Sequence, residues 1–376
     1  MSTFKPATEW IAPDVFPTEL LVNAKQIAID TETRDPNLTS IGPGYIRGDG
    51  EVVGISVACD GFEGYFPFGH ETGFNFPKNK VVDFFKKVCA SDNTKVFHNA
   101  PYDIGWLRTL GIKVNGKIVD TMIVAPLIDE NQFYYSLNGL GREYLNEGKT
   151  EAELNAAAAE WGLDPKAEMW RLPSAYVGTY ATQDAVLTLK LWDYFKVELE
   201  KQNLWNVFDL EMELLPIIIE MKRVGVRVDL ERAEKIKKEL ITKEKNLIKS
   251  IQDQSGVKDL QLWAARSLAQ VFDALKLSYL RTPTGQPSFT KAFLENHTHP
   301  VASLIREARE LNKSHSTFID SILKHQHNGR IHAEIRQLKG ESGGTVTGRL
   351  SMSNPNLQQV PARNKNIGPL IRSLFL

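Results

Sequence analysis

The chain has 376 residues, enough for two or three domains that each bury a core. Hydrophobic residues make up 42% and charged residues 24%, which is ordinary for a soluble protein. No apolar run approaches the ~20 residues of a membrane span, and no signal peptide pattern opens the chain, so we expect a cytoplasmic protein without a membrane partner. The two cysteines, Cys59 and Cys89, argue against a disulfide framework.

The net charge of −1 hides an uneven distribution along the chain. Residues 1–200 hold 18 Lys and Arg against 28 Asp and Glu, whereas residues 201–376 hold 27 against 18. An acidic half joined to a basic half suits a carboxylate metal site attached to a surface that binds a polyanion. Two unrelated surfaces of opposite charge would give the same totals.

The first informative stretch is the apolar run at residues 27–33, which predicts a strand carrying Asp30 and Glu32. Residues two apart point to the same face of a strand. Two buried acids on one face repel each other, and a divalent metal ion bound between them usually offsets this repulsion. The alternative is a strand end at which both acids are solvated.

The rest of the first 200 residues alternates strands with helices and then becomes helical, which indicates an α/β domain. Strands are predicted at 51–58, 64–68 and 95–98, and helices at 78–90, 121–127, 137–146, 151–161 and 181–200. A second helical region covers 204–223 and 229–251. We therefore expect two domains, 1–203 and 204–376.

Two further acidic motifs lie within the first domain. Asp103 falls in the first turn of a predicted helix, where an acid also simply suits the helix dipole. Tyr180 and Asp184 are four residues apart and share a helix face. Together the four acids Asp30, Glu32, Asp103 and Asp184 make a hard-oxygen ligand set suited to two Mg²⁺ or Mn²⁺ ions, and no Cys/His cluster favours zinc.

In this order, the patterns Asp-x-Glu, Asn-x-x-x-Asp and Tyr-x-x-x-Asp resemble the three motifs of the DEDD 3'-5' exonucleases, in the subclass with tyrosine in the third motif. The resemblance implies a ribonuclease H-like fold, which is a mixed sheet flanked by helices. It also implies that Tyr180 positions the attacking water and that Asn99 lies near the terminal nucleotide. The implied metal ligands are Asp30, Glu32, Asp103 and Asp184.

The string at residues 347–361 is rich in Arg, Asn and Gln, and it closely resembles the start of the polymerase domain in bacterial and phage family A DNA polymerases. Residues 282–288 resemble the tip of the thumb in that family. The resemblance implies a mostly helical thumb and the first part of a palm over residues 204–376. It also implies that Arg349, Asn356 and Gln358 contact primer-template DNA near its 3' end.

The sequence stops before the aspartate motifs and the fingers helix that family A polymerases use for synthesis. We therefore expect no polymerase activity from this chain alone, and a separate polypeptide with the rest of palm and fingers. The predicted function is the proofreading half of a split or truncated phage polymerase used in DNA replication, which removes nucleotides from single-stranded DNA 3' ends while the thumb holds duplex. The alternatives are a self-sufficient exonuclease and a non-catalytic DNA-binding subunit. For a viral protein, the compartment would be the host cytoplasm.

Overall fold

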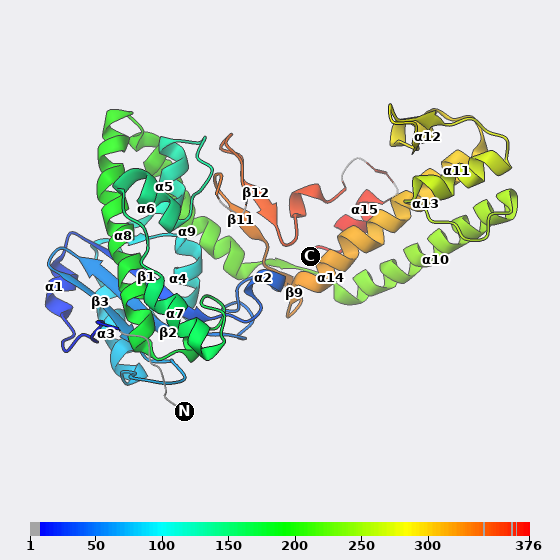
Figure 1. Ribbon diagram of the computed structural model, residues 1–376. Coiled ribbons are helices and arrows are strands. Elements are labelled where there is room, and N and C mark those ends of the chain that lie inside the picture. The colour runs from blue at the N-terminus through cyan, green and yellow to red at the C-terminus, as the bar shows by residue number, and fades with distance from the viewer. Residues whose placement is uncertain (1–7, 341–342, 362–363, 366) are drawn as a thin grey trace. The chain divides into compact units, whose positions relative to one another are not determined.

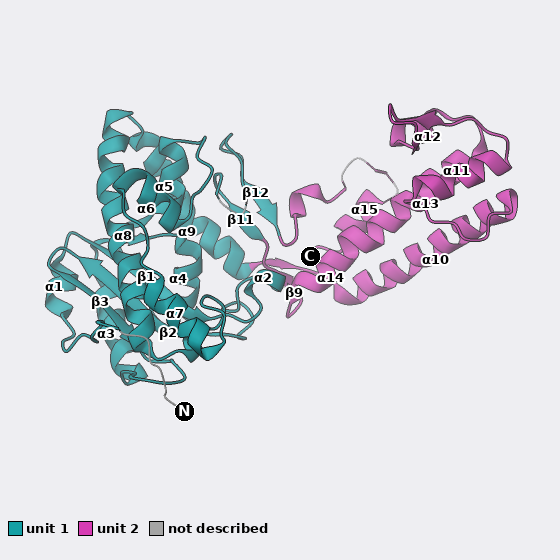
Figure 2. Ribbon diagram, in the orientation of Figure 1, with its two compact units in different colours: residues 1–224, 334–353 teal, residues 225–333, 354–376 magenta. Residues whose placement is uncertain are grey.

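The computed structural model describes residues 8–340, 343–361, 364–365 and 367–376, and the chain divides into two compact units (Figures 1 and 2). Unit 1 comprises residues 1–224 and 334–353, and unit 2 comprises residues 225–333 and 354–376. Unit 1 is thus discontinuous in sequence. Across the described ranges, we find no helix with the length and apolar character of a membrane span.

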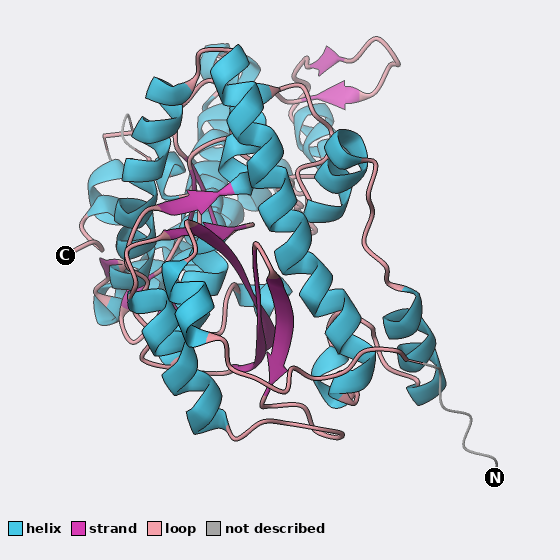
Figure 3. Ribbon diagram, turned by 90° about the vertical axis from the view of Figure 1, so that its left-hand side faces the viewer, coloured by secondary structure: helices cyan, strands magenta, loops and turns pink. Residues whose placement is uncertain are grey.

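Unit 1 is built on a five-stranded sheet with the strand order β3–β2–β1–β4–β5 (Figure 3). Its strands are β1 (Gln26–Arg34), β2 (Glu51–Cys59), β3 (Phe62–Pro67), β4 (Thr94–Phe97) and β5 (Ile118–Asp120). Strands β1, β2 and β3 pair antiparallel, whereas β4 pairs parallel with both β1 and β5. The expected mixed sheet flanked by helices is confirmed. The sequence did not predict β5, because three residues are too few to show a strand periodicity.

Helices surround this sheet within unit 1 (Figure 1). They are α1 (Thr18–Asn23), α2 (Leu38–Ile41), α3 (Lys78–Ala90), α4 (Ala100–Thr109), α5 (Thr121–Ile128), α6 (Leu137–Leu145), α7 (Ala152–Trp161), the short turn η1 (Met169–Arg171), α8 (Ser174–Lys201) and α9 (Trp205–Val224). Helix α8 begins seven residues before the expected position 181. Trp10 packs against this early part of the helix at Gly178. A Cβ atom at Gly178 would lie only 2.1 Å from the indole, so the contact requires a glycine there.

Helix α9, which we expected to open the second domain, packs in the core of unit 1. Its apolar residues Phe208, Met212 and Leu215 are buried in the same cluster as Ile27 and Ile29 of β1. The first compact unit therefore includes α9 and runs to Val224 before the chain enters the second unit. The apolar spacing of an amphipathic helix predicts a buried face but does not say which core covers that face.

The segment 334–353 returns to unit 1 and pairs β11 (Glu334–Arg336) with β12 (Ser351–Ser353) antiparallel. Two buried polar contacts join this segment to α9. Lys222 Nζ lies 2.8 Å from Glu334 Oε2, and Gln337 Nε2 donates to Glu211 Oε2 at 2.7 Å. Because Lys222, Glu211 and Gln337 are all buried, these contacts fix the return of the chain.

Unit 2 is mostly helical, as expected for residues after the first domain. Its helices are α10 (Leu230–Ser255), α11 (Ala265–Ala274), α12 (Lys291–Asn296), α13 (Pro300–Lys313), the π-helical η2 (Ser314–Ile319), α14 (Asp320–His325), η3 (Leu357–Gln359) and α15 (Gly368–Arg372). Its strands are β6 (Val226–Arg227), β7 (Leu280–Arg281), β8 (Pro287–Ser288), β9 (Gln326–His327) and β10 (Arg330–Ile331). Asp229 caps the long α10 by accepting from Arg232 N.

Candidate metal centre

Strand β1 and helix α8 bring together three of the four predicted ligands. Asp30 and Glu32 leave the same face of β1, and α8 packs against that strand and carries Asp184. One carboxylate oxygen from each of the three acids lies within 4.8 Å of the others. This separation allows a single cation to contact all three side chains.

The acid cluster is short of positive partners. Glu32 Oε1 and Asp184 Oδ1 are buried, and neither accepts a hydrogen bond from any residue that the structure describes. Burial and then repulsion from Asp184 raise the pKa of Asp30 to about 7. Burial and then the charge of Asp30 raise the pKa of Glu32 well above its usual range. A bound cation would compensate this buried negative charge.

Asp103, the remaining predicted ligand, lies in the first turn of α4 and faces β1 from the side. Its Oδ1 accepts from Thr31 N at 3.0 Å and from Thr31 Oγ1 at 2.6 Å. It is therefore not among the three acids that converge, but burial and then repulsion from Asp30 raise the pKa of its carboxyl well above the usual range. Thr31 thus fixes Asp103 beside the cluster.

Asp120 holds α4 in place, a role that the sequence did not reveal. Its carboxylate accepts from the backbone N of Asn99 at 2.9 Å, Ala100 at 2.8 Å and Met122 at 2.9 Å. It therefore caps two helices, α4 and α5, and supports the left-handed conformation of Asn99, where φ is 77°. The only sequence signal was an acid just before an apolar helix.

Tyr180 lies one turn before Asp184 on α8, and its hydroxyl is 3.3 Å from Lys149 Nζ. Burial and then the charge of Asp184 raise the pKa of Tyr180, so the hydroxyl keeps its proton at neutral pH. Lys149 also lies 2.7 Å from Asp184 Oδ2. The sequence did not single out Lys149, because a lone lysine in a loop carries no periodic signal.

The predicted DNA contacts lie on exposed parts of the chain. Asn99 is exposed at the start of α4, and Arg349 is exposed in the segment that returns to unit 1. Asn356 and Gln358 are exposed in unit 2, where the Asn356 side chain accepts from Gln358 N at 3.1 Å. Each is therefore accessible within its own unit.

The chemistry of the cluster fits a hard divalent cation. Every converging atom is a carboxylate oxygen, and the two partnerless oxygens are available as ligands. The partly buried His98 lies near Lys149, but burial lowers the pKa of its imidazole to about 3, and it is not among the converging groups. Mg²⁺ and Mn²⁺ suit this donor set better than zinc does.

The raised pKa of Asp30 predicts a pH-dependent stability. In metal-free buffer the folded protein binds this proton more tightly than the unfolded chain does, so lowering the pH from about 8.5 to about 6 should stabilise the fold. We expect a gain of about 1 kcal/mol relative to Asp30→Asn, whose neutral amide cannot titrate. The measurement is thermal unfolding of both proteins in EDTA across this range. If the melting temperatures of the two proteins changed with pH in parallel, this result would contradict the raised pKa of Asp30.

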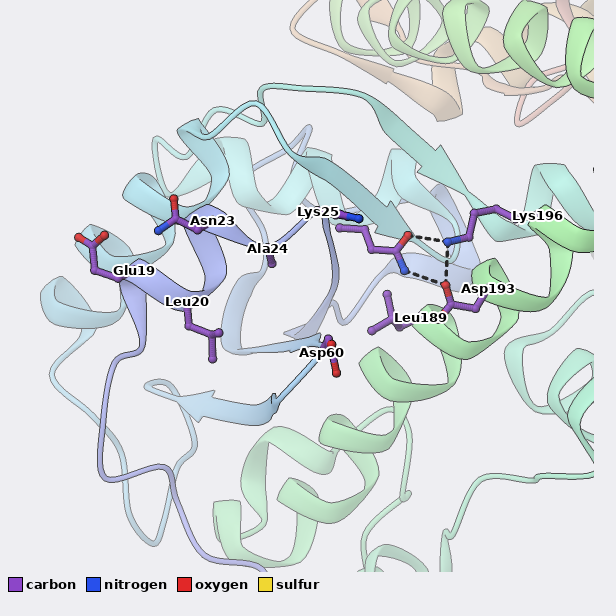
Figure 4. A pocket seen from close by; sticks show the side chains of 10 residues that line it. Glu19, Leu20, Asn23, Ala24, Lys25, Asp60, Leu189, Asp193 and Lys196 are labelled. Atoms are coloured by element: carbon purple, nitrogen blue, oxygen red, sulfur yellow. Dashed lines mark hydrogen bonds and ion pairs between the residues drawn. The ribbon is translucent and has the colours of Figure 1, made fainter.

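A separate pocket of about 940 Å³ lies on another side of unit 1, between α1, the turn after β2 and α8 (Figure 4). Lys196 Nζ contacts Gln26 Oε1 at 2.9 Å and Asp193 Oδ1 at 2.8 Å across its edge. Glu19 and Asp60 also line it, so its charges are mixed. None of the predicted site residues lies in this pocket.

Two family models match this chain. Residues 17–200 match the family model of the 3'-5' exonuclease, and residues 230–376 match the model of DNA polymerase family A. The chain belongs to DNA polymerase family A. The match to the exonuclease model covers β1, α4 and α8, which carry the four acids.

Relatives of this family A chain occur in phages and bacteria. It is 37% identical to a DNA-directed DNA polymerase of Pseudomonas phage M6, over 98% of this chain and 58% of the relative, and 32% identical to the DNA polymerase DpoZ of Vibrio phage phiVC8, over 87% and 55%. DNA polymerase I of Chloroflexus aurantiacus is 29% identical, over 95% and 37%. The chain thus spans less than two thirds of the length of these relatives.

A solved structure shares the fold. The polymerase domain of Pol1 from M. smegmatis, in complex with DNA primer-template and dNTP, superposes with a TM-score of 0.73 at 21% identity. The match covers 97% of this family A chain and 58% of that structure's chain.

Proposed function

We propose that this chain is the 3'-5' exonuclease part of a phage family A DNA polymerase and that it removes nucleotides from DNA 3' ends during replication. The observation that carries the proposal is the convergence of Asp30, Glu32 and Asp184 with two buried oxygens that lack a partner in the described structure. The match of residues 17–200 to the exonuclease model supports it. We assign residues 1–203 to the exonuclease domain and 204–376 to the thumb and partial palm.

Each of the predicted site residues would have its own role in the reaction. Asp30, Glu32, Asp103 and Asp184 would hold two divalent ions. Two such ions stabilise the attacking and the leaving oxygen of a phosphodiester displacement. Tyr180 would orient the attacking water through its neutral hydroxyl, since it keeps its proton at neutral pH. Asn99 would contact the terminal nucleotide.

The proposed thumb and partial palm would bind the primer-template duplex. The relative with the shared fold is described in complex with a DNA primer-template, which supports this role for the matched region. The exposed Arg349, Asn356 and Gln358 offer donors for phosphates and for minor-groove acceptors. A separate polypeptide with the remaining palm and fingers stays a prediction, as does action in the host cytoplasm.

A direct assay tests the proposal. The protein is incubated with a 5'-labelled single-stranded DNA and Mg²⁺, and the products are resolved on a sequencing gel. We expect stepwise shortening from the 3' end and none in EDTA. An intact oligonucleotide at high enzyme concentration would instead favour a non-catalytic DNA-binding subunit.

Replacing Tyr180 by Phe tests the role of its hydroxyl. We expect the rate of nucleotide release to fall about 10²-fold, because orientation of the water by this group is lost. The affinity for the metal should stay unchanged, since the phenol is not a proposed ligand. Tyr176→Phe, on the same helix and equally buried, is the matched control and should keep its activity. Equal rates for both variants would remove Tyr180 from the mechanism.

A further inference from the structure

Lys149 places its ammonium group within the acid cluster. Its Nζ lies 2.7 Å from Asp184 Oδ2 and 3.3 Å from Tyr180 Oη. The Lys149 side chain is 12% exposed and that of Asp184 is 6% exposed, so water screens this ion pair only weakly. Removing one partner of such a pair leaves an uncompensated buried charge, in contrast to a pair at the surface.

The loop that carries Lys149 is fastened to the helix that carries Asp184. Gln183, the residue before Asp184, accepts from Thr150 N at 2.5 Å and donates to Gly148 O at 3.0 Å. On the other side, Lys149 N donates to Asn138 Oδ1 at 2.9 Å. The backbone on both sides of Lys149 is thus held, and the approach of its ammonium group to the acids is built into the fold.

The positive charge of Lys149 acts on the whole acid cluster. It opposes the rise in the pKa values of Asp30 and Glu32 as well as that of Asp184. The Asp184 oxygen that it contacts belongs to a carboxylate of the proposed metal centre. The Lys149 ammonium group and a divalent ion would therefore both be attracted to the Asp184 carboxylate.

We propose that Lys149 is a built-in counter-ion of this centre, which balances the acids before metal binding and competes with the divalent ion for Asp184. The inference rests on the proposed function of the acids as metal ligands. Lys149 acts here as a positioning residue, because it holds the metal-free carboxylates close to one another. A divalent ion must displace its ammonium group from Asp184.

Lys149→Met, which keeps most of the length of the side chain without its charge, tests the proposal in two measurements. Calorimetric titration with Mn²⁺ near pH 8 should give a dissociation constant about tenfold lower than that of the wild type, as expected when a coupled competitor is removed. In EDTA the variant should melt several degrees lower, because the acids then repel one another without a counter-ion. Saturating Mn²⁺ should remove this difference in melting temperature.

The controls separate charge from packing. Lys149→Arg should keep the wild-type melting temperature in EDTA, and Lys190→Met should change neither measurement, because Lys190 pairs with Glu147 at the surface. Gln183→Ala loosens the loop and should raise the Mn²⁺ affinity by an intermediate factor, which decides the question if Lys149→Met does not fold.

Unchanged or weaker Mn²⁺ binding by Lys149→Met would overturn the inference, as would an unchanged melting temperature in EDTA. A wild-type protein that binds no Mn²⁺ would overturn the proposed function instead. In that case the melting temperatures in EDTA still decide whether Lys149 is a counter-ion.

Discussion

Asp30→Asn is expected to slow the removal of 3'-terminal nucleotides by about 10⁴-fold or more. The acid lies in the converging set, and loss of a ligand from a metal centre removes several kcal/mol of transition-state stabilisation, at about 1.4 kcal/mol for each factor of ten. The measurement is a single-turnover time course with single-stranded DNA and saturating Mg²⁺.

The same substitution should make the metal-free protein more stable. An amide at position 30 removes one of the charges that raise the pKa values of Glu32 and Asp103. Asp60→Asn is the matched control: Asp60 is exposed in the turn after β2, and its replacement should change neither rate nor stability. An Asp30→Asn protein that degrades DNA at the wild-type rate would exclude the acid cluster as the active site.

Glu334→Ala is expected to destabilise unit 1 by about 3 kcal/mol, because it leaves the buried Lys222 charge without its carboxylate. The Lys222 side chain is 6% exposed, and it also lies 5.6 Å from the centre of the Tyr45 ring, so the ammonium group cannot regain full hydration. Scanning calorimetry should show a melting transition several degrees lower.

The matching double variant, Lys222→Met with Glu334→Ala, should recover much of the loss, since it leaves no buried charge. Glu51→Ala serves as the surface control: Glu51 pairs with Arg34 at 3.4 Å, and both side chains are nearly half exposed. Its effect should stay below about 0.5 kcal/mol. A Glu334→Ala protein as stable as Glu51→Ala would show that the buried pair does not hold the return segment.

The local elements and the acids could be predicted because their signals are short in range. An apolar run fixes β1 and the common face of Asp30 and Glu32, and a four-residue spacing fixes Tyr180 and Asp184 on one face of α8. Their convergence follows from the packing of α8 on β1. Family resemblance predicted this packing, which the spacing alone did not.

Other features depend on contacts between residues far apart in sequence. Lys149 reaches the acids from an irregular loop, which the hydrogen bonds of Gln183 and Asn138 hold in place. The placement of α9 in unit 1 depends likewise on Glu334 and Gln337, more than 100 residues later. No local pattern encodes partners at such a distance.

The discontinuity of unit 1 has a consequence for the order of events during synthesis. The segment 334–353 pairs with α9 only after the intervening residues 225–333 have left the ribosome. Until then Lys222 and Glu211 lack their contacts with Glu334 and Gln337, so the nascent exonuclease region stays incomplete while the helical region is being made. Maturation of the acid-bearing unit is thereby tied to production of the region proposed to grip duplex DNA.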